Sequence, residues 1–182
     1  MDKFFVEIGA ANFDTLLPLA DAGWGGIVVE PIPKMVLELR KIYQSTSVRV
    51  IQGAVSDFDG EVDIAVARDD GSWLAGCSHI VSGNHLGYKL STSPDREGDF
   101  EQTIKSKCFT LETLFKEVPS VDFLKVDAEG HELNIFMNYS FDVKPRMIKV
   151  EHKHVDDKIL ARKLELNGYL VWAEKDDIYA IS

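Results

Sequence analysis

Acidic residues stand at the ends of most of the buried strands that the sequence predicts. They are Glu7, Glu30, Asp127, Glu129 and Glu151. In an open parallel α/β sheet the carboxyl ends of the strands meet at one edge, and such proteins bind their ligands beyond that edge. A carboxylate there can accept hydrogen bonds from a sugar or take a proton from a reacting hydroxyl group. The pattern therefore indicates a ligand site at the carboxyl edge of the predicted sheet.

The turn after the first strand consists of small residues, Gly9-Ala10-Ala11, followed by Asn12. Small side chains let a ligand approach the backbone, and Asn12 can cap a helix expected at residues 13–22, whose N-terminus would then face the site. Glu30 lies 21 residues after Gly9, near the offset of roughly 20 residues at which an acid accepts hydrogen bonds from ribose hydroxyls. Together these features favour an adenosine ligand. Taken singly, Gly9 also fits an ordinary turn glycine and Glu30 a solvated strand end.

Two histidines, His152 and His154, follow the strand expected at residues 147–151. Being two residues apart they would share a face, and His152 could take a proton from a hydroxyl nucleophile near neutral pH. They could also form an oxygen and nitrogen metal site with three nearby acids, Asp127, Glu129 and Glu151. An ordinary strand-end histidine is the simplest interpretation, and we assign no metal ligand from the sequence.

Short apolar strands alternate with helical segments in two parts of the chain. The first part predicts strands at 4–8, 27–30 and 48–51 with helical segments between them. Such alternation is typical of a parallel sheet covered on both faces. The alternation resumes with a short helix at 111–115, strands at 121–126 and 147–151, helices at about 131–138 and at 157–166, and a closing hairpin of 169–173 with 178–181.

The middle of the chain has a different pattern. Residues 61–66 and 102–109 alternate polar and apolar side chains, which predicts half-exposed strands that pair antiparallel. Residues 69–99 show little periodicity, and a loop of that length inside a compact domain is usually functional or disordered. We expect one domain over residues 1–182.

The composition excludes several classes of protein. The chain has 182 residues, 45% of them hydrophobic and 27% charged, as in a soluble globular domain. Two cysteines, Cys77 and Cys108, make no disulfide framework and suit a reducing compartment. No apolar run has the roughly 20 residues that span a bilayer. A net charge of −10 opposes binding to a phosphate backbone. We therefore expect a cytoplasmic protein with neither a membrane nor a nucleic-acid partner.

Several motifs carry a resemblance to a known family over residues 4–155, in matching order. They are Glu7-Ile8-Gly9-Ala10, Val29-Glu30-Pro31, Ala54-Val55-Ser56-Asp57 with Gly60, and Val121-Asp122-Phe123-Leu124-Lys125-Val126-Asp127-Ala128-Glu129-Gly130-His131-Glu132. Together they resemble the FkbM-type family of S-adenosylmethionine-dependent methyltransferases. The resemblance implies the Rossmann-like class I methyltransferase fold, an α/β fold with a seven-stranded, mostly parallel sheet whose last strand is antiparallel. The expected C-terminal hairpin accommodates that strand.

The resemblance also implies roles for individual residues. It places Glu7, Gly9 and Ala10 around the methionine part of the cofactor, Glu30 on the ribose, and Gly53 and Ala54 beside the adenine. The cofactor-binding residues are then Glu7, Gly9, Ala10, Asn12, Glu30, Pro31, Gly53, Ala54 and Asp127, and the catalytic candidates are Asp127, Glu129 and His152. Glu132 would contact substrate or lie on the helix surface. The chain departs from the family pattern in two ways: Glu7 replaces an aspartate, and no second glycine precedes Gly23.

These features predict a methyltransferase that uses S-adenosylmethionine to methylate a hydroxyl of a sugar, a glycan or another small molecule. Its partner would be a small-molecule or carbohydrate acceptor. Two alternatives remain at this point. A nicotinamide-dependent oxidoreductase would share Gly9 and Glu30, although it would be expected to carry a turn with three glycines. A non-catalytic nucleotide-binding module would be compatible with the reduced glycine motif.

Overall fold

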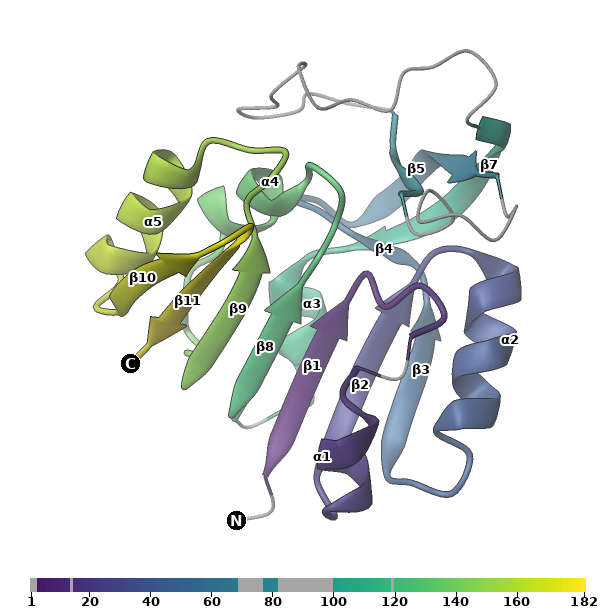
Figure 1. Cartoon of the computed structure of the whole chain (residues 1–182), viewed down its shortest axis with the longest axis horizontal. Coiled ribbons are helices and arrows are strands. Elements are labelled where there is room, and N and C mark those ends of the chain that lie inside the picture. Colours follow the sequence, from purple (N-terminus) through teal and green to yellow (C-terminus); the bar gives the residue numbers. More distant parts are fainter. Residues whose placement is uncertain (1–2, 14, 69–76, 82–99, 119) are drawn as a thin grey trace.

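The computed structural model describes residues 3–13, 15–68, 77–81, 100–118 and 120–182 (Figure 1). Its main element is a seven-stranded sheet in the order β10-β11-β9-β8-β1-β2-β3. The strands are β1 Phe4–Ile8, β2 Gly25–Glu30, β3 Val48–Gln52, β8 Phe123–Val126, β9 Met147–Glu151, β10 Leu170–Glu174 and β11 Asp177–Ile181. From β3 to β9 the neighbours are parallel, whereas β11 is antiparallel to both β9 and β10. The expected Rossmann-like sheet with a C-terminal antiparallel hairpin is confirmed.

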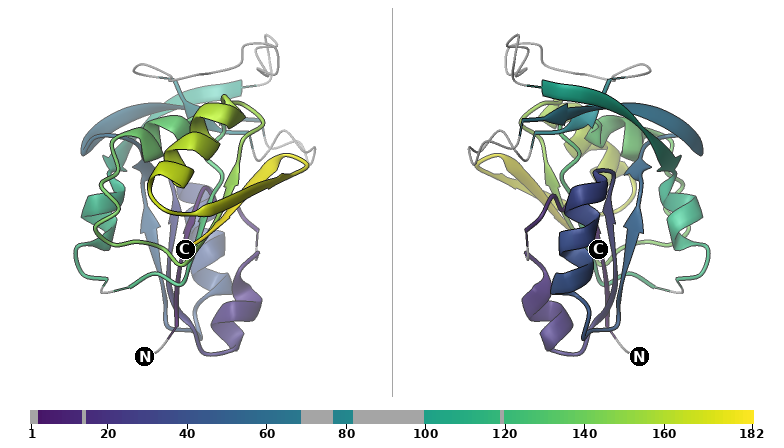
Figure 2. Two further views of the ribbon diagram at one scale, coloured as in Figure 1. Left: turned by 90° about the vertical axis from the view of Figure 1, so that its left-hand side faces the viewer. Right: turned by 90° about the vertical axis from the view of Figure 1, so that its right-hand side faces the viewer.

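Helices cover both faces of this sheet, as the left view of Figure 2 shows. The helices α1 Leu17–Asp21 and α2 Pro33–Ile42 pack on one face, where Phe5 and Val28 join their buried side chains. On the other face Val6 and Ile27 belong to the core formed with α3 Leu111–Phe115, α4 Glu132–Met137 and α5 Asp157–Leu166. Because neighbouring residues of one strand point to opposite faces, strands buried on both sides are mostly apolar. Glu7 on β1 and Lys125 on β8 are buried exceptions that form an ion pair.

The first helix is shorter than the sequence predicts. It begins at Leu17 instead of residue 13, its N-cap Leu16 makes no side-chain cap, and Pro18 occupies its first turn, where the fixed φ of proline suits helix initiation. The side chain of Asn12 donates a hydrogen bond to Glu38 (3.0 Å) on α2. The expectation that Asn12 caps a helix whose N-terminus faces the site is therefore wrong.

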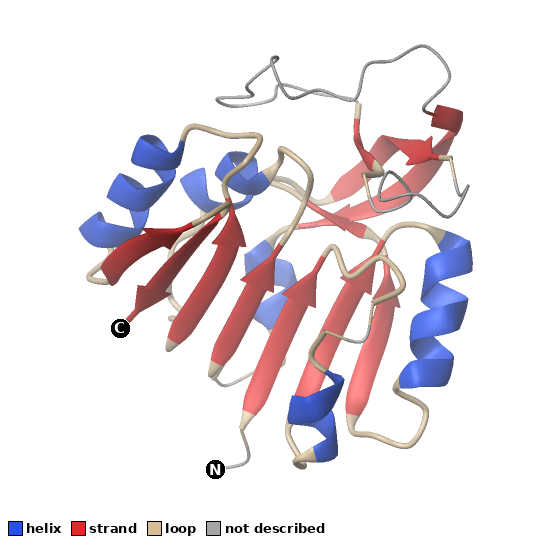
Figure 3. Ribbon diagram, in the orientation of Figure 1, coloured by secondary structure: helices blue, strands red, loops and turns tan. Residues whose placement is uncertain are grey.

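A second, four-stranded sheet lies beyond the carboxyl ends of the main sheet (Figure 3). Its order is β4-β7-β5-β6, with β4 Ala54–Val55, β5 Gly60–Ala67, β6 His79–Ile80 and β7 Phe100–Phe109. The predicted antiparallel pairing of 61–66 with 102–109 is confirmed. Within the stretch expected to be a loop, β6 pairs with β5, so His79 and Ile80 form part of this sheet. The remainder of that stretch, 69–76 and 82–99, lies outside the described residues.

Both cysteines are buried as free thiols. None of the helices in the described part of the chain has the length and apolar character needed to cross a bilayer.

Candidate functional site

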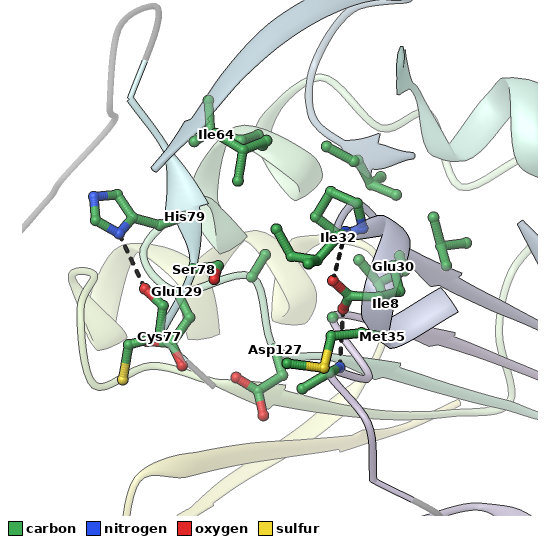
Figure 4. Close-up of a pocket in the computed structure, with 18 of the residues that line it drawn as sticks. Ile8, Glu30, Ile32, Met35, Ile64, Cys77, Ser78, His79, Asp127 and Glu129 are labelled. Carbon is green, nitrogen blue, oxygen red and sulfur yellow. Dashed lines mark hydrogen bonds between the residues drawn. The ribbon is translucent and has the colours of Figure 1, made fainter. Parts of the chain in front are cut away.

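A pocket opens between the carboxyl edge of the main sheet and the second sheet (Figure 4). The turns after β1, β2 and β3 supply one wall, to which Gly9, Ala11, Glu30, Pro31, Gly53 and Ala54 contribute. We call this wall the ribose wall. The opposite wall comes mainly from the turn after β8 and includes Asp127, Glu129 and Lys153; we call it the carboxylate wall. Side chains of the second sheet, including Ile64, His79 and Ile80, line the pocket from beyond the strand ends.

The two walls touch at Gly9. This residue has φ +72°, and a Cβ atom there would lie 1.6 Å from the carbonyl oxygen of Asp127. The backbone N–H of Gly9 donates to Val29 on β2, and the N–H of Asp127 donates to Ile8 on β1 (both 3.0 Å). Only glycine fits both this backbone conformation and this contact. The resulting floor of the pocket is bare backbone, which a ligand can approach closely.

Glu30 is the buried acid of the ribose wall, with 4% of its surface exposed. Its Oε2 accepts a hydrogen bond from the N–H of Ala11 and its Oε1 accepts one from the N–H of Ile32, each at 2.9 Å (dashed in Figure 4). Burial raises its pKa to about 7, against the opposing effect of the two N–H donors. Within the described residues no cation forms an ion pair with it. The carboxylate therefore links two turns while it faces the pocket.

Asp127, on the carboxylate wall, directly follows β8 and forms an ion pair with Lys125 of that strand. The ammonium of Lys125 lies 3.5 Å from Asp127 Oδ2 and 3.2 Å from Glu7 Oε1. Burial raises the pKa of both carboxyl groups, while Lys125 acts in the opposite direction. Glu7 is fully buried and does not line the pocket. Glu7 is connected to the site through Lys125, whose ammonium forms ion pairs with both Glu7 and Asp127.

Glu132, the first residue of α4, shapes the turn that carries the carboxylate wall. It is 1% exposed, and its carboxyl oxygens accept hydrogen bonds from the N–H of Ala128 (2.7 Å) and of Gly130 (3.1 Å). The turn places Glu129 at φ +49° and Gly130 at φ +102°. Burial raises the pKa of Glu132 to about 8. Glu132 does not line the pocket and is not on an exposed helix surface. The expectation that it contacts substrate or lies on the helix surface is therefore wrong.

The two histidines after β9, His152 and His154, do not share a face as expected, because they contact different parts of the protein. The ring of His152 lies 3.2 Å from the carbonyl oxygen of Lys175 in the β10–β11 turn, outside the pocket. His154 is buried, and its Nε2 lies 3.2 Å from Oε2 of Glu129. Glu151, beside them, has its pKa raised to about 7 by burial and then by the charges of Asp127 and Glu129.

The pocket brings together most of the residues predicted from the sequence: Gly9, Glu30, Pro31, Gly53, Ala54, Asp127 and Glu129. It does not include Glu7, Ala10, Asn12 or His152 among its lining. Sequence reasoning missed the lining at the start of α2 and in and beside the second sheet. These residues are Ile32, Met35, Ile64, Cys77, His79 and Ile80. The alternation of polar and apolar residues at 61–66 could have indicated that one face of this strand is buried. It could not have indicated that this face lines the pocket.

A family model described as the methyltransferase FkbM domain matches residues 7–173. No curated protein matches the chain at a significant level. Among solved structures, the C-terminal domain of precorrin-6Y C5,15-methyltransferase from Rhodobacter capsulatus is similar with a TM-score of 0.50 and 9% identity, over 99% of this chain and 79% of that one. Methanococcus jannaschii fibrillarin, a pre-rRNA processing protein, is similar with a TM-score of 0.51 and 14% identity, over 99% of this chain and 66% of that one. At these identities the likeness concerns the fold.

Proposed function

The chain belongs to the FkbM methyltransferase domain family, whose members use S-adenosylmethionine, and from this premise we propose that it transfers the cofactor's methyl group to a hydroxyl oxygen of a sugar or another small molecule. The observation that carries the acceptor part of the proposal is the position of Asp127, a carboxylate that lines the pocket directly after a central strand. The cofactor part is supported by Glu30, a buried carboxylate that accepts hydrogen bonds from two backbone N–H groups and lines the same pocket.

The ribose wall fits the nucleoside part of this cofactor. A carboxylate has about four acceptor sites, and two of those on Glu30 are used by Ala11 and Ile32. The two hydroxyls of a ribose are donors that match the remaining sites. Apolar side chains of Ile32 and Met35 line the same pocket and suit the faces of an adenine ring.

The carboxylate wall suits the reaction. When bound, the cofactor supplies an electrophilic methyl group on a sulfonium sulfur. Asp127 sits at the end of a central strand, and Lys125 anchors it 3.5 Å away, so its carboxylate can accept a hydrogen bond from an acceptor hydroxyl and orient it. Catalysis then consists mainly of placing that oxygen at roughly 3–3.5 Å from the methyl carbon. The raised pKa of Asp127 makes it a better proton acceptor than an ordinary aspartate.

The charge of the chain supports a small acceptor. A net charge of −10 opposes association with a polyanion, so we do not extend to this chain the pre-rRNA processing role of fibrillarin. His152, whose ring lies at the β10–β11 turn, is not part of the proposed machinery. The acidic groups of the proposed catalytic machinery are Asp127 and Glu129.

A labelled methyl group tests the proposal. The protein is incubated with cofactor carrying a ¹³C-methyl group and with panels of sugars, hydroxylated small molecules, amines and RNA, and the products are identified by NMR. We expect label in a methoxy group of a hydroxylated compound. Label found only on nitrogen, on carbon or on RNA would contradict the proposed acceptor class while leaving the cofactor assignment intact.

A further inference from the structure

Three potential metal-ligating side chains converge behind the carboxylate wall: Glu129, Glu151 and His154. They come from the turn after β8, the end of β9 and the segment that follows it. Their nearest ligand atoms all lie within 4.8 Å of one another. Glu129 also lines the pocket, so the cluster adjoins the space proposed for the acceptor.

The separation of the closest pair matches a shared metal ion. Oxygen and nitrogen ligands sit about 2.1 Å from a divalent transition metal, so two adjacent ligands are about 3.0–3.4 Å apart. His154 Nε2 and Glu129 Oε2 are 3.2 Å apart. Glu151 offers a third ligand atom within 4.8 Å of both.

A second observation concerns Glu151. Its Oε2 is buried and accepts no hydrogen bond from any described residue. A buried carboxylate oxygen without a donor is costly, and a cation supplies the missing interaction.

We propose that Glu129, Glu151 and His154 bind one divalent transition-metal ion of the Mn²⁺ class at the edge of the pocket. Two carboxylates and one imidazole form a mixed oxygen and nitrogen set that suits such ions better than Mg²⁺ or Ca²⁺, which prefer oxygen alone. The ion would place positive charge where an acceptor oxygen enters. Only this last consequence rests on the proposed methyltransferase function; the site itself does not.

The test uses Mn²⁺ on metal-stripped protein, followed by titration calorimetry and electron paramagnetic resonance. We expect saturable binding of one ion per chain and a magnetic coupling to one imidazole nitrogen. Glu151→Gln should weaken Mn²⁺ binding at least tenfold, and His154→Asn should abolish the nitrogen coupling. Glu174→Gln, at an exposed acid on β10, is the matched control and should leave both signals unchanged.

S-adenosylhomocysteine binding by the same preparations separates the two proposals and shows that each variant is folded. If wild-type protein binds S-adenosylhomocysteine but shows no saturable Mn²⁺ binding, the metal site alone is overturned. Glu129 and His154 would then form only an ion pair. Mn²⁺ binding that is indifferent to Glu151→Gln, or that lacks nitrogen coupling, would overturn it too. If the protein binds Mn²⁺ with the expected signals but does not bind S-adenosylhomocysteine, the result would support the metal site and contradict the proposed function.

Discussion

The ribose wall and the carboxylate wall are each stabilised by one buried glutamate that accepts hydrogen bonds from two backbone N–H groups. Glu30 bonds to Ala11 and Ile32, and Glu132 bonds to Ala128 and Gly130. Burial raises the pKa of both, to about 7 and about 8. The difference is position, because Glu30 lines the pocket and Glu132 does not.

This difference separates two ways of building a site. On the ribose wall the group that stabilises the turns is also the group proposed to bind the ligand, so stability and affinity should change together. On the carboxylate wall Glu132 stabilises the turn and leaves Asp127 and Glu129 facing the pocket, so stability and activity should be separable. Substitutions that act on each wall test this distinction.

Gly9→Ala should have the largest effect, because it disrupts the contact between the walls. Its Cβ would lie 1.6 Å from the Asp127 carbonyl at a backbone φ of +72°, so strands β1 and β8 must separate. We expect a loss of at least about 4 kcal/mol in the free energy of unfolding, measured by denaturant titration. Gly60→Ala, whose Cβ would meet only Phe58 at 3.4 Å, is the control. Equal stability of the two variants would contradict the close packing at Gly9.

Glu132→Ala tests the carboxylate wall. It leaves the buried N–H groups of Ala128 and Gly130 without their acceptor, which should cost about 2–4 kcal/mol of stability. The remaining folded protein should bind S-adenosylhomocysteine within about threefold of wild type, a difference of less than 1 kcal/mol. Glu165→Ala, at an exposed acid on α5, should change stability by less than about 0.5 kcal/mol. An affinity loss as large as that of a Glu30 variant would place Glu132 in the ligand site.

Glu30→Gln tests the ribose wall. The amide keeps one acceptor oxygen but turns an NH₂ group toward a backbone donor, so both stability and affinity should fall. We expect S-adenosylhomocysteine to bind about 10–150-fold more weakly, which corresponds to about 1.5–3 kcal/mol for hydrogen bonds to a charged group. Asn12→Ala, which removes a hydrogen bond to Glu38 outside the pocket, should change the affinity less than about threefold, under 1 kcal/mol. Unchanged affinity in Glu30→Gln would remove Glu30 from the ribose contact.

The raised pKa of Glu30 gives the wild-type protein a pH signature. Since its pKa rises from 4.5 unfolded to about 7 folded, its contribution favours the unliganded fold at low pH and is lost as pH rises through 7. Ligand binding should have the opposite trend, because ribose hydroxyls require the ionised carboxylate. The dissociation constant measured by calorimetry should rise about tenfold from pH 8 to pH 6, and Glu30→Gln should flatten this dependence. A flat wild-type profile would mean that the ligand does not need the charge of Glu30.

Asp127→Asn should have the smallest effect on stability and a clear one on turnover. The substitution is nearly isosteric at a strand end, so we expect a melting temperature within a few degrees of wild type. Methyl transfer should fall at least tenfold, about 1.4 kcal/mol of transition-state stabilisation. Both quantities are measured on one preparation. A strongly lowered melting temperature with unchanged turnover per folded molecule would make Asp127 a structural residue.

Sequence patterns predicted the scaffold better than the site. The bounds of β9 and α5 agree with those expected, because the apolar periodicity of both segments marks them in the sequence. Apolar periodicity could not predict the burial of Glu132. This burial depends on the turn with positive φ angles at Glu129 and Gly130, which directs the Glu132 side chain inward. Nor could apolar periodicity predict the pairing of β6 with β5, which is a long-range contact of a two-residue strand.

Titration calorimetry with S-adenosylhomocysteine and NAD, side by side on the wild-type protein at pH 8, tests the central claim most directly. Both ligands carry the ribose that Glu30 could accept, so the comparison asks whether this pocket is built for the methyl-donor cofactor. We predict saturable binding of one S-adenosylhomocysteine per chain and no saturable binding of NAD at the same concentrations. Saturable binding of NAD without binding of S-adenosylhomocysteine would contradict the account.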